Sequence, residues 1–219
     1  MDGNGRWAMA RGLPRIAGHA AGVAAVRRTV RAAPSNGIGI LTLFAFSSDN
    51  WRRPADEVDA LMSLLAAYLE SETARCIENG VRLEVIGRRD RLDPSLCAAI
   101  ARAETSTAGG ERLRLRVALD YSGRDAILAA ARAACDLSFD AVASALGPPV
   151  DLLIRTGGER RLSDFLLWEC AYAELVFTRT MWPDFDGGDL GAAVQDFRSR
   201  QRRFGALPAP PRLREAWLD

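Results

Sequence analysis

The sequence predicts an α/β fold with a mostly parallel central sheet flanked by helices. Short apolar runs of strand-forming residues, as at 37–46 and 150–154, alternate with longer helical patterns such as 55–79. These short runs are apolar throughout, which is typical of strands buried on both faces of a parallel sheet. A length of 219 residues suits one such domain, placed at 1–207, with a Pro-rich tail at 208–219.

Composition excludes several classes of protein. The formal net charge is +1, so the chain lacks the strongly basic balance of a nucleic-acid binder and no nucleic-acid partner is expected. No apolar run is long enough to span a bilayer and no secretion signal opens the chain, so we expect a cytoplasmic protein with at most peripheral membrane contact. The cysteines lie in stretches interpreted as helical, show no C-x-x-C spacing and are expected to be reduced core residues: Cys76, Cys97, Cys135 and Cys170.

Glycines open the chain and free its backbone to bind an anion. Gly3 and Gly5 lie in the run 1–8, where positive φ lets successive N–H groups turn toward one point. A helix predicted at 19–33 follows, and its N-terminal N–H groups and dipole add to the attraction. Taken alone the run is weak evidence, because Asp-Gly and Asn-Gly are also common turn dipeptides. Together with the helix that follows, the run predicts a phosphate-binding nest.

Charged side chains in the same stretch fit a diphosphate accompanied by a metal ion. Arg6 and Arg15 supply guanidinium groups, whose forks match phosphate oxygens. Asp2 would repel a bare phosphate. A carboxylate beside a diphosphate is, however, a suitable protein ligand for Mg²⁺, so Asp2 predicts a magnesium site.

The remaining elements continue the alternation. Strand 37–46 is followed by a long helix at 55–79, whose apolar residues recur at helical spacing. Further strands are predicted at 81–86, 113–119, 150–154 and 175–177, and further helices at 94–104, 124–137, 139–146 and 189–201. Arg114 and Arg116 alternate with apolar residues in the strand 113–119, which places that strand near an edge of the sheet.

Polar residues gather where two predicted strands end, at 47–53 and 155–163, which is where open α/β sheets bind their ligands. Together with the opening run, these clusters offer the following anion partners: Arg6, Arg15, His19, Arg53, Arg155, Arg161 and Ser163. Two acids, Asp2 and Glu174, accompany them. So much positive charge suits two diphosphates with a metal better than one phosphate group.

Several motifs, in this order, carry a resemblance to a known family. They are Met-Asp-Gly-Asn-Gly-Arg-Trp-Ala at 1–8, Gly-His at 18–19, Ala-Phe-Ser-Ser-Asp-Asn-Trp-Arg-Arg-Pro at 45–54, Arg-Thr-Gly-Gly-Glu-Arg-Arg-Leu-Ser at 155–163, Phe-Leu-Leu-Trp at 165–168, Tyr-Ala-Glu-Leu at 172–175 and Trp-Pro-Asp-Phe at 182–185. From Met1 to Gly205 the chain resembles the cis-prenyltransferase family, most closely its bacterial undecaprenyl diphosphate synthases.

The resemblance implies the cis-prenyltransferase-like fold and a Mg²⁺-dependent transferase of class EC 2.5.1. Such an enzyme condenses isopentenyl diphosphate with an allylic diphosphate, expected to be farnesyl diphosphate, and forms a cis double bond at each addition. The expected product is a long polyprenyl diphosphate of undecaprenyl type. The resemblance also implies a homodimer.

The site residues follow from the resemblance, position by position. Asp2 would hold Mg²⁺, and Glu174 matches the second metal-associated acid. The allylic diphosphate would be bound by Gly3, Asn4, Gly5, Arg6, Arg15, His19 and Arg53, where His19 would also favour its departure. Isopentenyl diphosphate would be held by Arg155, Arg161 and Ser163, helped by Arg202, Arg203 and Gly205 reaching across from the other subunit. Trp7 and Trp51 would line the allylic pocket. Further substrate-binding residues would be Ser47, Ser48, Asp49 and Leu162.

Asn50, with Ser47 nearby, stands where the family places the group implicated in proton removal. An amide is a poor base, so three proton acceptors stay open: a carboxylate, a hydroxyl relay, or the released diphosphate.

The sequence departs from the family pattern at several positions. The family usually has Glu at Asp49, Asn at Asp164, and Asn-Tyr-Gly-Gly-Arg where 120–124 reads Asp-Tyr-Ser-Gly-Arg. The family also has a strand ahead of the opening run. Either that strand precedes this sequence or the sheet has one strand fewer.

Three rival functions follow from other readings of the same residues. One is irregular coupling of two allylic diphosphates to a lavandulyl-type product, for which Asp49 and Asp164 leave room. A second is a non-catalytic subunit, which the intact nest and Asp2 disfavour. The third is a generic phosphate-binding module, which predicts no apolar tunnel.

The resemblance implies a tunnel for the growing chain, walled by helices 19–33 and 55–79 and strand 40–46. Ala45 leaves room beside the first isoprene units, and Ala66 and Ala67 similarly thin the opposite wall. We therefore expect a long product.

Overall fold

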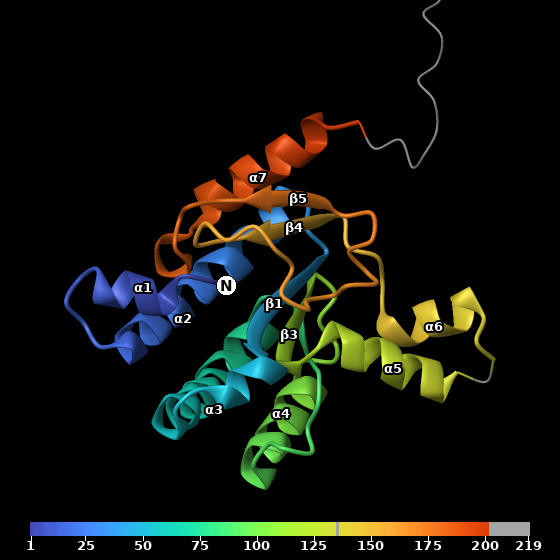
Figure 1. Cartoon of the computed structure of the whole chain (residues 1–219), viewed down its shortest axis with the longest axis horizontal. Coiled ribbons are helices and arrows are strands. Elements are labelled where there is room, and N and C mark those ends of the chain that lie inside the picture. The colour runs from blue at the N-terminus through green and yellow to red at the C-terminus, as the bar shows by residue number, and fades with distance from the viewer. Residues whose placement is uncertain (135, 202–219) are drawn as a thin grey trace, which may run out of the picture.

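The computed structural model describes residues 1–134 and 136–201 (Figure 1). Its strands form two sheets. One has the order β1 (Ile40–Ser47), β3 (Leu113–Tyr121), β2 (Val81–Ile86), and the other pairs β4 (Leu152–Arg155) with β5 (Glu174–Phe177). Each of these pairings is parallel. The predicted α/β class with parallel strands is confirmed, although the described strands divide into two sheets instead of one.

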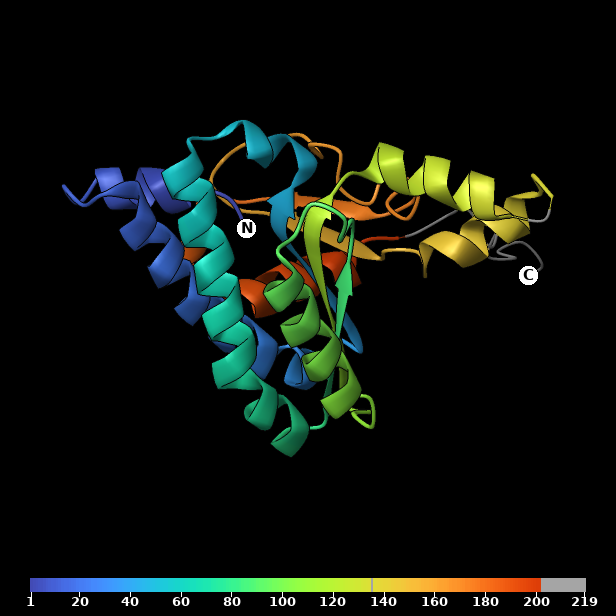
Figure 2. The ribbon, with the colours of Figure 1, turned by 90° about the horizontal axis from the view of Figure 1, so that it is seen from below.

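Helices cover the sheets on several sides. They are α1 (Asn4–Met9), α2 (Arg15–Ala32), α3 (Ala55–Glu78), α4 (Pro94–Ser106), α5 (Gly123–Ala133), α6 (Phe139–Leu146) and α7 (Gly187–Ser199). In Figure 2, α2, α3 and α4 lie on one side of the three-stranded sheet, while α5 and α6 project together at the other end. The helix α7 packs against both α2 and β4.

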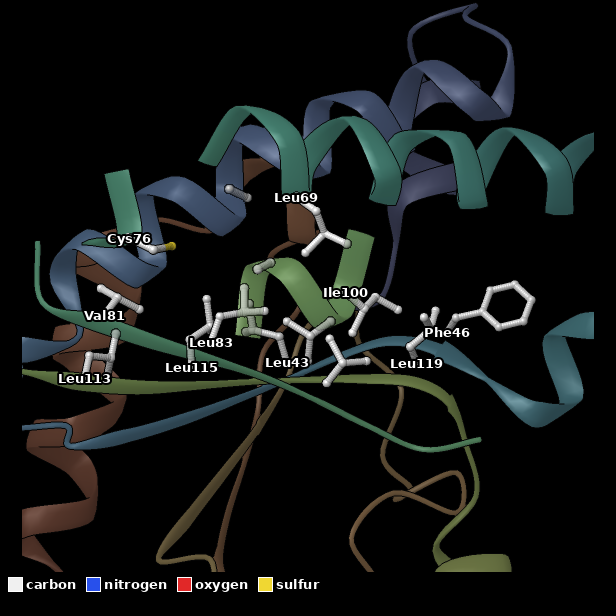
Figure 3. Close-up of a cluster of buried hydrophobic side chains, with 14 of the residues drawn as sticks. Leu43, Phe46, Leu69, Cys76, Val81, Leu83, Ile100, Leu113, Leu115 and Leu119 are labelled. Atoms are coloured by element: carbon white, nitrogen blue, oxygen red, sulfur yellow. The ribbon is translucent and has the colours of Figure 1, made fainter. Parts of the chain in front are cut away.

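The main core lies between the three-stranded sheet and the helices α3 and α4. Leu83, Leu115 and Leu119 point from neighbouring strands toward Leu69 and Ile100 (Figure 3). Alternate residues of each strand share one face, so the period of two in these strands supplies the apolar surface that the helices bury.

The strand β3 is central, and its predicted place near the sheet edge is wrong. Arg114 donates from Nε to Oε1 of Glu84 at 2.7 Å, and Arg116, buried in the same strand, lies 4.0 Å from Oε2 of that residue. Glu84 stands directly opposite Arg116 in β2. Glu84 compensates the buried charge of Arg116 only in part, because burial lowers the pKa of Arg116 and its Nε has no hydrogen-bond partner among the described residues.

Several predicted boundaries shift in the structure. The helix predicted from residue 19 begins at Arg15, the first strand begins at Ile40, and the helix predicted to 137 ends at Ala133. Cys170 is buried as expected but lies in a turn instead of a helix, whereas Cys76 and Cys97 lie in α3 and α4.

Cys135 and the predicted tail at 208–219 lie outside the described residues. In the described part of the chain, each helix is too short or too polar to cross a bilayer.

Candidate active site

A single cavity of about 1210 Å³ brings the three polar clusters together. Its walls come from α2, α3 and β1, as the tunnel prediction required, and also from β4. Apolar side chains line its interior, among them Val23, Val26, Leu41, Leu43, Ala45, Leu61, Leu65 and Leu69. The predicted roles of Ala66 and Ala67 are wrong: Ala66 packs against the core and Ala67 is exposed, so neither faces the cavity.

The opening run forms a short helix where an open nest was expected. Gly3 takes φ 99° and caps α1, so the first-turn N–H groups of that helix lie at the cavity lining. Close packing on α2 requires glycine at Gly18, because a Cβ there would lie 1.9 Å from the carbonyl oxygen of Asn4. The glycine pattern thus serves helix packing as well as an anion cradle.

Asp2 links the opening run to the polar segment 155–163 that follows β4. Its Oδ2 lies 3.0 Å from Nη2 of Arg155, and its Oδ1 accepts the N–H of Gly3 at 2.7 Å. Its main-chain N–H and carbonyl both bond to the hydroxyl of Thr156, which follows β4. Partial burial raises the pKa of Asp2, but the bonds from Arg155 and Gly3 outweigh it and lower the pKa below its ordinary value. The group is therefore a carboxylate at neutral pH.

The segment after β4 forms the second side of the cavity mouth. Arg155 donates from Nη1 to the hydroxyl of Ser163 at 2.7 Å and also to the carbonyl of Arg161. Arg161 is paired with Glu159 at 2.6 Å, and Glu159 lies 3.9 Å from Arg6 of the opening run. The opening run and the segment 155–163, which are both predicted to bind diphosphate, are thus directly linked. Leu162 also lines the cavity.

The polar cluster 47–53 contains a 3₁₀ turn, η2 (Ser48–Arg52), which follows β1. Asn50 accepts the N–H of Ser47 at 3.0 Å within a capping box, and both residues line the cavity. Asp49 also lines it and lies 3.6 Å from Arg52. The amide of Asn50 is therefore held in one orientation at the mouth.

Sequence reasoning missed Glu57, which joins three of the predicted anion partners. This carboxylate lies 2.9 Å from Arg53, 3.4 Å from Arg15 and 3.5 Å from Nε2 of His19, and its side chain is only 13% exposed. The spacing of four residues between Arg53 and Glu57 at the start of a helix is the signal that could have indicated it. Glu57 thus holds together two arginines and a histidine that all line the cavity.

His19 is buried beside these arginines. Burial, followed by the charge of Arg53, lowers the pKa of His19 below its ordinary value. Among the described residues, its buried Nε2 has no hydrogen-bond partner. In the tautomer with the proton on Nε2, the neutral ring can donate a hydrogen bond to a ligand in the cavity.

The main cavity is not lined by four of the described site residues: Trp7, Ser48, Trp51 and Glu174. Trp7 donates from its indole N–H to Asp184 at 2.7 Å, which holds the ring against η3 (Trp182–Asp184). Trp51 packs against Phe46, and Arg91 lies over its ring. Ser48 faces a smaller neighbouring pocket.

Glu174 lies away from Asp2 within the chain. It pairs with Leu152 at the start of β4, whereas Asp2 contacts Arg155 at the end of that strand. Its carboxylate bonds to Arg200 at 2.8 Å. Within residues 1–134 and 136–201, no group of three or more His, Cys, Asp or Glu side chains is placed to hold a metal. Arg202, Arg203 and Gly205 lie outside the described residues.

Asp120, which stands where the family usually has Asn, does not add an unpaired negative charge to the site. Its fully buried carboxylate accepts two hydrogen bonds from Arg91 and lies 3.3 Å from the hydroxyl of Ser48. The pairing with Arg91 offsets the extra charge locally.

Comparison with known proteins identifies the family. A family model described as "Putative undecaprenyl diphosphate synthase" matches residues 1–205. The chain belongs to the cis-prenyltransferase family. This result confirms the resemblance read from the motifs.

Two curated relatives cover nearly the whole chain. It is 60% identical over 217 residues to "Isoprenyl transferase 1" of Bradyrhizobium diazoefficiens, which covers 95% of this chain and 88% of the relative. It is 50% identical over 220 residues to "Ditrans,polycis-undecaprenyl-diphosphate synthase ((2E,6E)-farnesyl-diphosphate specific)" of Pseudomonas aeruginosa, with 94% of this chain and 88% of the relative covered.

Two solved structures share the fold. The lavandulyl diphosphate synthase of Lavandula x intermedia, in complex with dimethylallyl diphosphate, superposes with a TM-score of 0.89 at 32% identity, covering 94% of this chain and 95% of that one. A probable undecaprenyl diphosphate synthase of Campylobacter jejuni gives 0.81 at 34% identity, covering 85% and 92%. The predicted fold is confirmed.

Proposed function

We propose that this chain condenses isopentenyl diphosphate with farnesyl diphosphate and elongates the product to a long polyprenyl diphosphate of undecaprenyl type. One observation carries the proposal: the same cavity is lined by arginines from all three polar clusters and by apolar side chains of α2, α3 and β1. Such a cavity fits a substrate with a diphosphate head and a growing hydrocarbon tail. The identity to a relative named as a farnesyl-diphosphate-specific synthase supports the same choice of primer.

The two ends of the mouth take different substrates in this proposal. The allylic diphosphate binds at the start of α1 and α2, against Gly3, Asn4, Gly5, Arg6, Arg15, His19 and Arg53. Isopentenyl diphosphate binds at Arg155, Arg161 and Ser163, after β4. In support, Glu57 contacts Arg15, His19 and Arg53 of the first set. In the second set, Arg155 donates a hydrogen bond to Ser163.

The arginines stabilise the charge that the reaction develops. The allylic carbon–oxygen bond breaks and diphosphate leaves with the electron pair, while the double bond of isopentenyl diphosphate supplies the electrons of the new carbon–carbon bond. A proton is then lost from the added unit. Guanidinium groups held at the mouth before the reaction favour departure because they need little rearrangement as the charge grows.

Asp2 is the proposed magnesium ligand. Its ionised, partly exposed carboxylate at the mouth fits Mg²⁺, which is commonly bound by one or two carboxylates together with substrate phosphate oxygens. When bound, the ion supplies Lewis-acid stabilisation of the leaving diphosphate. Asp2 also orients Arg155 through their direct contact.

Asn50 orients substrate in this proposal and does not take the proton. Its Oδ1 already accepts the N–H of Ser47, and a neutral amide has little basicity. The carboxylate, hydroxyl and diphosphate alternatives for the proton acceptor all remain compatible with this role.

The homodimer is proposed from exposed apolar side chains on one part of the molecule. Leu128 on α5, Phe139 on α6 and Leu137 between them are 53%, 69% and 79% exposed, on the arm that projects in Figure 2. Apolar side chains gathered on a projecting arm indicate an interface. In the dimer, residues 202–205 would complete the site of the other subunit. Sedimentation of the purified protein tests this assembly.

A single incubation series tests the activity. Purified protein with Mg²⁺, labelled isopentenyl diphosphate and farnesyl diphosphate should give products of about ten or more isoprene units. Removing Mg²⁺ with a chelator should abolish them. A branched product from dimethylallyl diphosphate alone would instead support the irregular coupling. The structural match to a lavandulyl diphosphate synthase is the observation that favours this alternative. Failure to form any product would favour a non-catalytic or generic phosphate-binding role.

A further inference from the structure

The loop that follows the Arg155–Ser163 segment has an unfavourable backbone. Ser163, Asp164 and Leu166 take φ of 52°, 62° and 45°, although none of them is glycine. A side chain in this left-handed region costs free energy, so contacts elsewhere must hold the loop in place. The loop is therefore fixed by particular interactions.

Asp164 makes those interactions with the beginning of α5. Its carboxylate accepts the hydroxyl of Ser122 at 2.5 Å, the main-chain N–H of Arg124 at 3.0 Å and the Nε–H of Arg124 at 3.3 Å. Its carbonyl accepts the N–H of Gly123 at 2.7 Å. The first-turn N–H groups of a helix lack intrahelical acceptors, and the helix dipole favours a negative charge there. Asp164 thus fastens the loop to α5.

This attachment lies one residue from the substrate segment. The hydroxyl of Ser163 accepts Nη1 of Arg155 at 2.7 Å, and Nη2 of Arg155 contacts Asp2 at 3.0 Å. A change in the position of Asp164 would move Ser163 first and Arg155 through it. Asp2 is also held by Thr156 and Gly3, so the effect should fade toward the allylic side.

We propose that Asp164 is a positioning residue: it binds the start of α5 and thereby holds Ser163 and Arg155 in the geometry that receives isopentenyl diphosphate. The inference rests on the proposed function, because it assumes which substrate this segment binds. It explains how an aspartate can line a cavity that receives diphosphates, since its charge is offset by Arg124 and by the N-terminal N–H groups of α5.

Two substitutions separate backbone conformation from side-chain contacts. Asp164→Gly keeps the left-handed conformation available but removes the carboxylate, whereas Asp164→Asn keeps an oxygen acceptor and tolerates the same φ. The glycine variant should raise the KM for isopentenyl diphosphate about tenfold, as expected from loss of charge-assisted hydrogen bonds. The asparagine variant should restore most of this loss. The KM for farnesyl diphosphate should stay within about twofold in both variants, because the allylic set has separate supports.

Arg124→Ala provides a second, independent measurement. The Arg124 side chain is 73% exposed, so its removal should leave the fold intact. Alone it should raise the KM for isopentenyl diphosphate about two- to fivefold, and it should add nothing in the Asp164→Gly background, because both changes break the same contact. Where the glycine variant does not fold, the KM values of Arg124→Ala alone test the proposal, and an unchanged KM for isopentenyl diphosphate in that variant would overturn it.

The matched control is Asp93→Gly. Asp93 also accepts a helix N-terminal N–H, that of Ser95 at 2.8 Å, but it caps α4 outside the cavity. Both KM values should be unchanged there. An unchanged KM for isopentenyl diphosphate in Asp164→Gly, an equal rise for both substrates, or additive effects of Arg124→Ala would each overturn the proposal. A wild-type protein without prenyl transfer would refute the proposed function itself, so the two failures are distinguishable.

Discussion

Replacing Asp2 with alanine separates the catalytic role of this carboxylate from its role in the fold. The change removes the contacts to Arg155 at 3.0 Å, to the N–H of Gly3 at 2.7 Å and to Arg6 at 3.6 Å. The main-chain bonds between residue 2 and Thr156 remain, because they do not use the side chain. The segment should therefore keep its position.

The expected effects on stability and on turnover differ widely. The Asp2 side chain is 37% exposed, so solvent screening limits its ion pairs to about 1 kcal/mol of stability, or roughly 2–4 °C in melting temperature for a chain of this length. Turnover should fall by about a thousandfold or more, since the proposed metal ligand and the orientation of Arg155 are lost together.

Incorporation of labelled isopentenyl diphosphate at saturating Mg²⁺ measures the turnover, and thermal melting measures the stability. Asp90→Ala is the control, because Asp90 pairs with Arg88 at 2.6 Å away from the cavity and its loss should leave turnover unchanged. Asp2→Asn keeps the size of the side chain and should be nearly as inactive as alanine. Turnover within about tenfold of wild type in Asp2→Ala would refute the metal-ligand assignment.

Three further predictions follow from the same cavity. Arg161→Ala should raise the KM for isopentenyl diphosphate far more than that for farnesyl diphosphate, because a charged phosphate partner is lost at one site only; steady-state kinetics with each substrate varied would contradict this by showing equal effects. Because burial, and next Arg53, lower the pKa of His19 in the folded protein, the unfolded chain binds more protons just below the ordinary pKa of 6.5, so stability should fall as pH decreases through that window. Urea unfolding midpoints across this range should show a smaller pH slope in His19→Gln, and an identical slope would exclude His19 as the source. Ala45→Leu should narrow the cavity beside β1 and shorten the products, since a packed wall does not accept a larger side chain without strain; an unchanged product distribution would show that Ala45 does not limit elongation.

The sequence was sufficient to predict the family, the class of fold and most of the elements. Short apolar runs indicate strands, and apolar residues at helical spacing indicate helices. Both patterns are local in the sequence. For this reason α3, β2 and α6 lie close to their predicted ranges. Two of the polar clusters could be assigned to a site because each follows the carboxyl end of a strand, where α/β folds bind ligands, and the opening run because it precedes a helix. Their common cavity agrees with that expectation.

Tertiary structure alone decided which polar groups pair with which. Glu84 allows Arg116 to lie in a central strand, Asp184 holds the ring of Trp7 away from the cavity, and Asp164 is tied to α5. These partners lie far apart in the sequence, with 40 residues between Arg124 and Asp164 and 177 between Trp7 and Asp184, so no local period indicates them. Hydrophobic burial depends on the side-chain pattern within one element, whereas an ion pair depends on the orientation of two elements. The sequence could therefore determine the elements and the residue types of the site, and only the folded chain could determine their mutual orientation.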